Sequence, residues 1–221
     1  MKRESTMKLT HLSLHRLFNY LVPSIVLLSF IFHSPARSEV ALDGTMGPKM
    51  TIEGPEYQIT PDHGTVINTR NLFHSFKQFN IDTGQTATFS GPDSIKNILG
   101  RVTGGSASNI DGALRVKIPY ADLYLLNPSG FVFGPNASLD LSGSFHATSS
   151  DYITTDNQGL FYANPRMDSI LTIGSPESFG FLSGQPGHIT INEASLEVGD
   201  EKTLSIRSEE HTSELQSLSH I

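Results

Sequence analysis

The chain has 221 residues, enough for one domain with its own core. Its 19 glycines, 12 prolines and low charged fraction of 17% are typical of stacked strands and turns rather than of a helical bundle, and the absence of cysteine excludes disulfides and a cysteine nucleophile. Residues 39–206 hold 9 Lys and Arg against 18 Asp and Glu, an acidic balance that argues against nucleic acid and anionic membranes as partners.

Residues 1–38 have the pattern of a Sec signal peptide. Basic residues at the start are followed by the apolar run Leu21–Phe32, and the small residues Ala36 and Ser38 favour cleavage between Ser38 and Glu39. The run is short for a membrane-spanning helix, which needs about 20 residues, and an uncleaved anchor is the alternative. We therefore expect the Sec machinery to be one partner and the mature chain to begin at Glu39.

Short strands separated by turn residues are predicted from Glu39 onward. Residues 39–61 are rich in glycine and proline, and we expect them to cap the first coil, with a flexible lead-in as the alternative. The spacing of the apolar residues in the segment 95–102 also fits a helical turn, but Gly100 and the turn residues that follow favour a strand. The strands predicted up to this point are 49–52, 57–59, 65–68, 72–79, 86–89 and 95–102.

The segment 113–118 has the clearest alternation in the chain. It follows the turn Asp111-Gly112, and its apolar residues alternate with Arg115 and Lys117. Because its outer face is charged, we expect this strand to belong to a small antiparallel excursion from the main fold.

The stretch 122–150 organises the rest of the fold. Asn127-Pro128-Ser129-Gly130 fits a type I turn, the apolar strand Phe131–Phe133 follows, and Gly134-Pro135-Asn136 turns again. Strands this short do not suit a sandwich, whose turns come about every 8–12 residues, and they favour one coil of a β-solenoid. The later strands are predicted at 152–153, 160–162, 171–173, 179–182, 188–191, 196–198 and 204–206.

This stretch resembles the amino-terminal two-partner secretion (TPS) domain of filamentous-haemagglutinin-like exoproteins. The family motif Asn-Pro-Asn-Gly-Ile corresponds to Asn127, Pro128, Ser129, Gly130 and Phe131, with Ser129 and Phe131 as departures. Phe133, Gly134, Pro135, Asn136 and Ala137 match a second turn, and 143–148 and 98–112 also match. The likeness covers about 62–191, and Asn164-Pro165 begins a loose counterpart of a second motif, Asn-Pro-Asn-Leu.

The resemblance implies an all-β fold: a right-handed parallel β-helix, or single-stranded solenoid, with an amino-terminal cap. It further implies a non-enzymatic secretion-signal domain, without cofactors, of a large adhesin-like exoprotein. Its partner would be an Omp85-like outer-membrane transporter with POTRA domains, which would recognise the chain in the periplasm of a Gram-negative-type bacterium. The chain would fold as a monomer at the cell surface and nucleate the coils that follow.

The residues leave two other functions open, a secreted β-helical polysaccharide-active enzyme and a glycan-binding module. Three or more carboxylates in one exposed groove would favour the enzyme, but the aspartates form no close cluster and the histidines lack metal-ligand spacing, so no catalytic or metal site is predicted. These residues are Asp82, Asp93, Asp111, Asp122, Asp140 and Asp151, and His63, His74, His146 and His188.

Residues 207–221 form a tail of different character. The string Arg207–Ser217 resembles one reading frame of a sequencing-adapter oligonucleotide, and a genuine polar tail is the alternative. We expect a non-native tail and a native secretion domain at 39–206.

Overall fold

The computed structural model describes residues 39–182, 185–208 and 211–216, so the predicted signal peptide and the Ser38 side of its cleavage site lie outside the described residues. Within these ranges the fold is all-β, and its one helical element is the short 3-10 turn Pro61–His63. No helix in the described part of the chain is long and apolar enough to span a bilayer.

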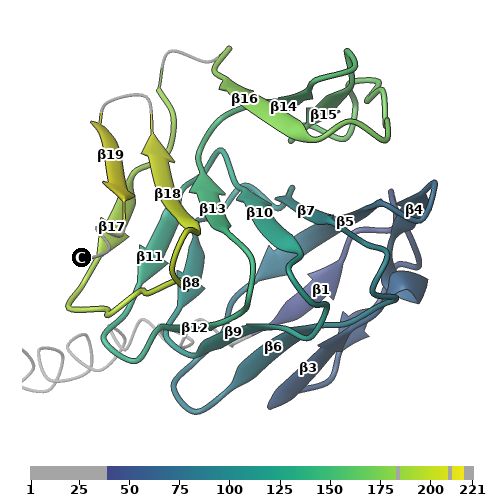
Figure 1. Ribbon diagram of the computed structural model, residues 1–221. Coiled ribbons are helices and arrows are strands. Elements are labelled where there is room, and N and C mark those ends of the chain that lie inside the picture. The colour runs from purple at the N-terminus through teal and green to yellow at the C-terminus, as the bar shows by residue number, and fades with distance from the viewer. Residues whose placement is uncertain (1–38, 183–184, 209–210, 217–221) are drawn as a thin grey trace, which may run out of the picture. The chain divides into compact units, whose positions relative to one another are not determined.

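Three parallel sheets form a β-solenoid of about four turns, as predicted (Figure 1). The parallel part of sheet A contains β5 (Asn71–Phe79), β7 (Asn97–Val102), β10 (Asp122–Leu126), β13 (Phe145–Thr148) and β18 (Thr203–Ser208). Sheet B contains β3 (Glu56–Ile59), β6 (Thr86–Phe89), β9 (Ala113–Val116) and β12 (Ser138–Asp140). Sheet C contains β8 (Ser108–Ile110), β11 (Phe131–Phe133) and β17 (Ile189–Ile191).

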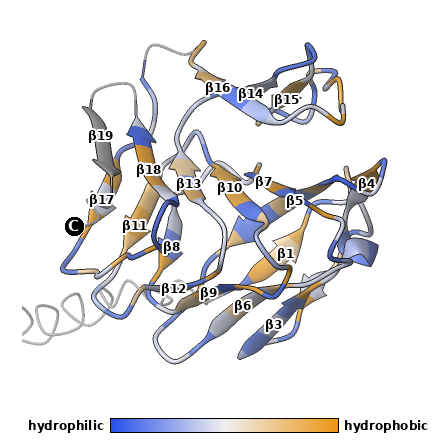
Figure 2. Ribbon diagram, viewed as in Figure 1, coloured by the Kyte–Doolittle hydropathy of each residue, from blue (hydrophilic) through white to orange (hydrophobic). Residues whose placement is uncertain are grey.

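Hydrophobic side chains from all three sheets belong to the main core of the solenoid. The ribbon in Figure 2 shows that hydrophobic residues recur along the strands of these sheets. Along β10, Leu123 and Leu125 point into this core, while Tyr124 and Leu126 belong to a second cluster on the opposite face of sheet A. Aromatic rings link successive coils, with a ring-centroid distance of 6.3 Å between Phe133 and Phe145. Each coil therefore buries its hydrophobic face against the next one.

The first described residues close the amino-terminal edge of sheet A. The strand β1 (Val40–Leu42) pairs antiparallel with β5 on one side and with β2 (Thr51–Ile52) on the other, and β4 (Thr65–Ile67) also pairs antiparallel with β5. Val40, Leu42 and Ile52 belong to the main core. This segment is thus the predicted cap and not a flexible lead-in.

An antiparallel sheet leaves the solenoid after β13. It contains β14 (Tyr152–Thr155), β15 (Leu160–Tyr162) and β16 (Pro176–Gly180), and Ile153 and Phe161 pack against Phe73 and Leu99 on the outer face of sheet A. Sheet A is therefore buried on both faces over part of its width.

The structure corrects three strand predictions. The segment 113–118 is not in the antiparallel excursion: β9 pairs parallel with β6 and β12, and its outward Arg115 forms an ion pair with Asp140 of the next coil, with Nε and Oδ2 2.6 Å apart. No strand forms at 171–173 or 196–198; Leu196 and Val198 pack against the core from a loop. Apart from these predictions, β19 (His211–Gln216) in the expected tail pairs antiparallel with β18.

Candidate functional site

The first predicted motif forms a tight turn between β10 and β11. The Gly130 N–H donates to the carbonyl oxygen of Asn127 at 2.8 Å, and the Ser129 N–H donates to Asn127 Oδ1 at 2.9 Å. The first bond closes the predicted β-turn, and the second is an Asx turn in which the side chain satisfies a backbone donor.

Asn127 also ties its own coil to both neighbouring coils. Its side chain is fully buried, and Nδ2 donates to the carbonyl oxygen of Ser106 and to Ser108 Oγ, each at 3.0 Å. Its backbone N–H donates to the carbonyl oxygen of Thr148 at 2.9 Å. The polar atoms of a buried amide need hydrogen-bond partners. The Asn127 amide nitrogen finds its partners in the neighbouring coil.

Glycines allow the next coil to pack directly on this turn. Gly130 has a φ of +93°, and a Cβ there would lie 2.1 Å from the carbonyl oxygen of His188. A Cβ on Gly187 would lie 2.0 Å from the carbonyl carbon of Ser129, and the Gly187 N–H donates to the carbonyl oxygen of Pro128 at 2.7 Å. Both positions therefore require glycine.

The second predicted turn follows β11 and forms a polar ladder at another corner of the solenoid. Phe133 is buried, Gly134 and Pro135 lead into the turn, and the Asn136 N–H donates to Asp111 Oδ1 at 2.9 Å. Asn136 Nδ2 lies 3.2 Å from each Asp111 oxygen, and Thr83 Oγ1 donates to Asp111 Oδ2. Asn136 is exposed, so this ladder faces solvent.

The weak second motif has the same turn chemistry as the first. The Arg166 N–H donates to Asn164 Oδ1 at 3.0 Å, and the Met167 N–H donates to the carbonyl oxygen of Asn164 at 3.1 Å. Unlike Asn127, Asn164 is exposed. The turn at Asn164 therefore has the hydrogen bonds of the turn at Asn127, without the bonds to neighbouring coils.

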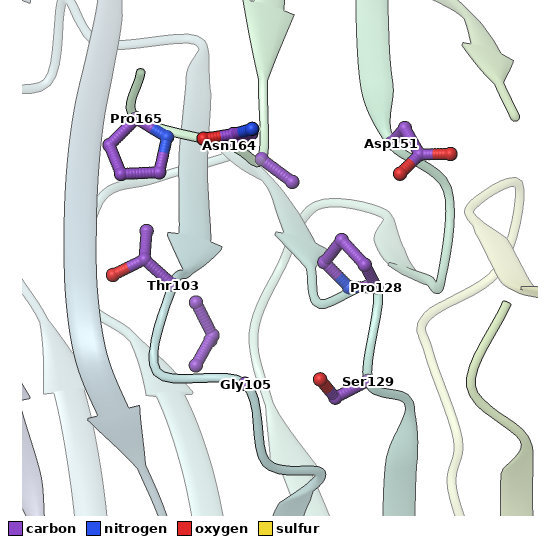
Figure 3. Close-up of a pocket in the computed structure, with 9 residues that line it drawn as sticks. Thr103, Gly105, Pro128, Ser129, Asp151, Asn164 and Pro165 are labelled. Atoms are coloured by element: carbon purple, nitrogen blue, oxygen red, sulfur yellow. The ribbon is translucent and has the colours of Figure 1, made fainter. Parts of the chain in front are cut away.

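The two Asn-Pro turns lie on opposite sides of one groove (Figure 3). Pro128 and Ser129 line it from the solenoid, and Asn164 and Pro165 line it from the loop after β15. The groove has a volume of about 240 Å³, and the rest of its wall is formed by Val102, Thr103, Gly105, Asp151 and Ala163. No local residue pattern predicts that the two turns meet, because their meeting depends on how the antiparallel sheet folds back over sheet A.

A buried polar network beside this groove was not predicted from the sequence. Arg101, only 2% exposed, donates from Nε to Ser75 Oγ at 2.8 Å, from Nη1 to the carbonyl oxygen of Tyr162 at 2.7 Å and from Nη2 to Thr45 Oγ1 at 2.9 Å. One guanidinium thus joins the cap, the solenoid and the antiparallel sheet. No residue pattern around position 101 signals this, because its partners come from distant segments.

The charges in this network balance each other. Burial lowers the pKa of Arg101, and the Asp43 carboxylate opposes that shift. Burial raises the pKa of Asp43, but hydrogen bonds from Ser75, Thr45 and Thr103 outweigh it and hold that pKa below its ordinary value. Both groups are therefore ionised at neutral pH.

The predicted candidate carboxylates do not converge. The groove contains Asp151, and the two other pockets described each hold one carboxylate, Glu177 and Asp156. No group of three His, Cys, Asp or Glu side chains among the described residues could hold a metal ion.

Two of the histidines are neutral at neutral pH: His74, which is fully buried, and His146, which is half-buried. His74 lies inside the main core, where burial lowers its pKa to about 4, and His146 on the outer face of sheet A also has a pKa near 4, because of burial and the positive charge of Arg207. His74 donates from Nδ1 to the carbonyl oxygen of His63 at 3.2 Å, but its Nε2 has no partner.

A parallel β-solenoid with a capped amino end, an antiparallel excursion and paired Asn-Pro turns defines a class of β-helical domains. Residues 39–218 match the TPS secretion domain family, so the chain belongs to that family. It is 36% identical over 104 residues to the heme/hemopexin-binding protein of Haemophilus influenzae; the alignment covers 47% of this chain and 10% of that protein. No solved structure matches the chain.

The chain is thus a secretion domain of a secreted exoprotein, and the family implies an outer-membrane transporter of a two-partner system as its partner. It spans only about a tenth of the curated relative's length.

Proposed function

We propose that residues 39–206 are the secretion signal of a larger adhesin-like exoprotein. Sec delivers the chain to the periplasm, an Omp85-like barrel recognises it through POTRA domains, and the solenoid folds at the cell surface. The observation that carries this proposal is the family match together with the meeting of both Asn-Pro turns at one groove.

Features of the fold suit passage through a barrel and refolding outside. The chain has no cysteine, so no periplasmic disulfide opposes threading. Each coil pairs its strands with the preceding coil, so a folded coil is a template for the next. The periplasm supplies no nucleotide, and folding free energy outside is a driving term for export.

The two Asn-Pro turns have different roles in this proposal. Asn127 acts through folding, because its side chain is buried and joins three coils. Pro128, Ser129 and the exposed Asn164 and Pro165 present the groove that the barrel contacts at the cell surface, after the solenoid and the antiparallel sheet have folded. In the nascent chain, recognition proceeds by strand addition, in which an extended segment pairs along an open sheet edge.

Co-expression with the partner barrel tests the proposal. Asn127→Ala with Pro128→Ala is expected to lower the amount of exoprotein in the medium and to leave a periplasmic pool that is degraded. Pro135→Ala, in the exposed second turn, is the matched control and should be exported normally. Unchanged export of the double variant would contradict the role of this turn.

The alternative functions gain less support from the structure. The predicted sign of a polysaccharide-active enzyme was a groove with three or more carboxylates, whereas the three pockets described hold one each. Heme or hemopexin binding is stated in the name of the relative, of which this chain matches a tenth. We place the ligand-binding activity of the whole exoprotein outside the solenoid described here.

A further inference from the structure

Two hydroxyl groups link the buried guanidinium of Arg101 to the carboxylate of Asp43. Ser75 Oγ accepts a hydrogen bond from Arg101 Nε at 2.8 Å and donates one to Asp43 Oδ2 at 2.7 Å. Thr45 Oγ1 accepts from Arg101 Nη2 at 2.9 Å and donates to Asp43 Oδ1 at 2.8 Å. Asp43 and Thr45 belong to the amino-terminal cap, so the cap supplies a negative charge that opposes the cost of burying this guanidinium.

The antiparallel sheet also covers this guanidinium. Arg101 Cζ lies 5.2 Å from the centroid of the Phe161 ring, and Nη1 donates to the carbonyl oxygen of Tyr162. Taking an arginine out of water is costly unless its charge is compensated and its donors are bonded. The antiparallel sheet therefore buries Arg101 at a low cost only when the cap has placed Asp43 and Thr45 beside it.

The same network reaches both walls of the groove. Residues 163–165, which follow Tyr162 directly, form the wall that the antiparallel sheet contributes. On the solenoid side, Thr103 lines the groove, and its Oγ1 donates to Asp43 Oδ2 at 2.9 Å. The network thus holds the backbone next to one wall and a side chain of the other wall.

We propose that Arg101 is a positioning residue that couples the groove to the amino-terminal cap, so that the wall at 163–165 docks stably only after the cap has folded onto sheet A. When Asp43 is not in place, docking of the antiparallel sheet buries a guanidinium that lacks its counter-charge, and the sheet and the groove open more readily. The coupling is a property of the fold alone. Its meaning for export, that the barrel meets a complete groove only on a chain whose amino-terminal end has folded, rests on the proposed function.

Amide hydrogen exchange of the full chain, followed residue by residue by NMR at neutral pH, tests the coupling. The Ala163 N–H, which donates to the carbonyl oxygen of Asp151, reports opening of the antiparallel sheet, and the Asn127 N–H reports opening of the solenoid. Asp43→Asn removes the counter-charge and should raise exchange at Ala163 at least about tenfold more than at Asn127. The matched control is Asp111→Asn, because Asp111 also accepts hydrogen bonds in a turn but lies at another corner of the solenoid, and it should change exchange at both amides by the same factor.

A second set of variants shows whether the effect passes through Arg101. Arg101→Met removes the buried charge and keeps a long apolar side chain, so adding Asp43→Asn to it should change exchange at Ala163 less than about twofold. Thr45→Val removes one hydroxyl bridge, leaves both charges, and should raise exchange at Ala163 about threefold. Its control is Thr51→Val, whose hydroxyl bonds only within the cap, and which should leave Ala163 unchanged.

Equal exchange at the antiparallel sheet in Asp43→Asn and Asp111→Asn would overturn the proposal. An effect of Asp43→Asn that is equally large in the Arg101→Met background would overturn it as well, because the coupling would then bypass the guanidinium. If Arg101→Met does not fold, the hydroxyl variants decide, and equal exchange in Thr45→Val and Thr51→Val would contradict the coupling.

Export with the partner barrel is measured separately, so that a failure of the proposed function can be told apart from a failure of the coupling. Raised exchange together with normal export of Asp43→Asn would support the coupling and contradict the contact between groove and barrel. Lowered export of Asp43→Asn without any change in exchange would overturn the coupling.

Discussion

Replacing Asn127 with alanine should destabilise the whole solenoid. The side chain is fully buried and takes part in three hydrogen bonds, two to the preceding coil and one within its own turn. Each such bond contributes about 1 kcal/mol, and the loss leaves the buried Ser108 hydroxyl without its partner, which adds about 1 kcal/mol. A part of this is recovered by water at the exposed Ser106, so we expect a loss of about 3 kcal/mol.

Urea unfolding measures this loss directly. With a slope of about 2 kcal/mol/M, the midpoint of Asn127→Ala should fall by about 1.5 M at unchanged slope. Asn136→Ala is the control, because Asn136 is also next to a proline in a turn but is exposed and makes side-chain contacts of 3.2–3.3 Å only. Asn136→Ala should lower the free energy of unfolding by about 0.5 kcal/mol. Equal midpoints for the two variants would refute the argument that Asn127 acts through folding.

Two further predictions concern the core and the packing of coils. The pKa of His74 is about 4 in the fold and 6.5 in the unfolded chain, so the contribution of His74 to stability is complete above pH 6.5 and is lost as the pH falls towards 4. From this residue, the free energy of unfolding should drop by about 2 kcal/mol between pH 7 and pH 5. His74→Leu should flatten that part of the plot of urea midpoint against pH. Gly187→Ala should lower the midpoint of thermal unfolding by at least about 5 °C, because the added Cβ would lie 2.0 Å from the backbone of Ser129. The control is Gly105→Ser, at a surface position where a Cβ meets nothing within 4 Å, and it should cost only the strain of a φ of +77°. Similar thermal midpoints for the two variants would contradict the close approach of coils at Gly187.

The sequence allowed most of the solenoid to be predicted because its signals are local. Asn127, Pro128 and Gly130 occupy the turn positions expected of them, and the Gly130–Asn127 bond closes the predicted turn. The strand at 95–102 was correctly preferred over a helix. Short apolar runs between turns therefore carry enough information to place the strands of each coil.

Pairing partners were not predictable in the same way. The alternation around Arg115 fits a parallel strand with one exposed face as well as it fits an antiparallel one, and only the neighbouring strands β6 and β12 decide between them. The groove likewise depends on Pro128 and Pro165 facing the same space from distant segments, and the network of Arg101 depends on Thr45 and Tyr162. These are long-range contacts that no local pattern encodes.

The geometry also explains why two departures from the family motif leave the turn intact. At position 129 the turn uses the backbone N–H, which donates to Asn127 Oδ1, and the Ser129 side chain makes none of the turn's hydrogen bonds. Ser129 therefore changes only the surface of the groove. Phe131 is fully buried and stacks near Phe133, with ring centroids 5.9 Å apart, so it changes only the packing of the core. Since one departure faces the groove and the other the interior, any difference in recognition by the partner should follow position 129 and any difference in stability position 131.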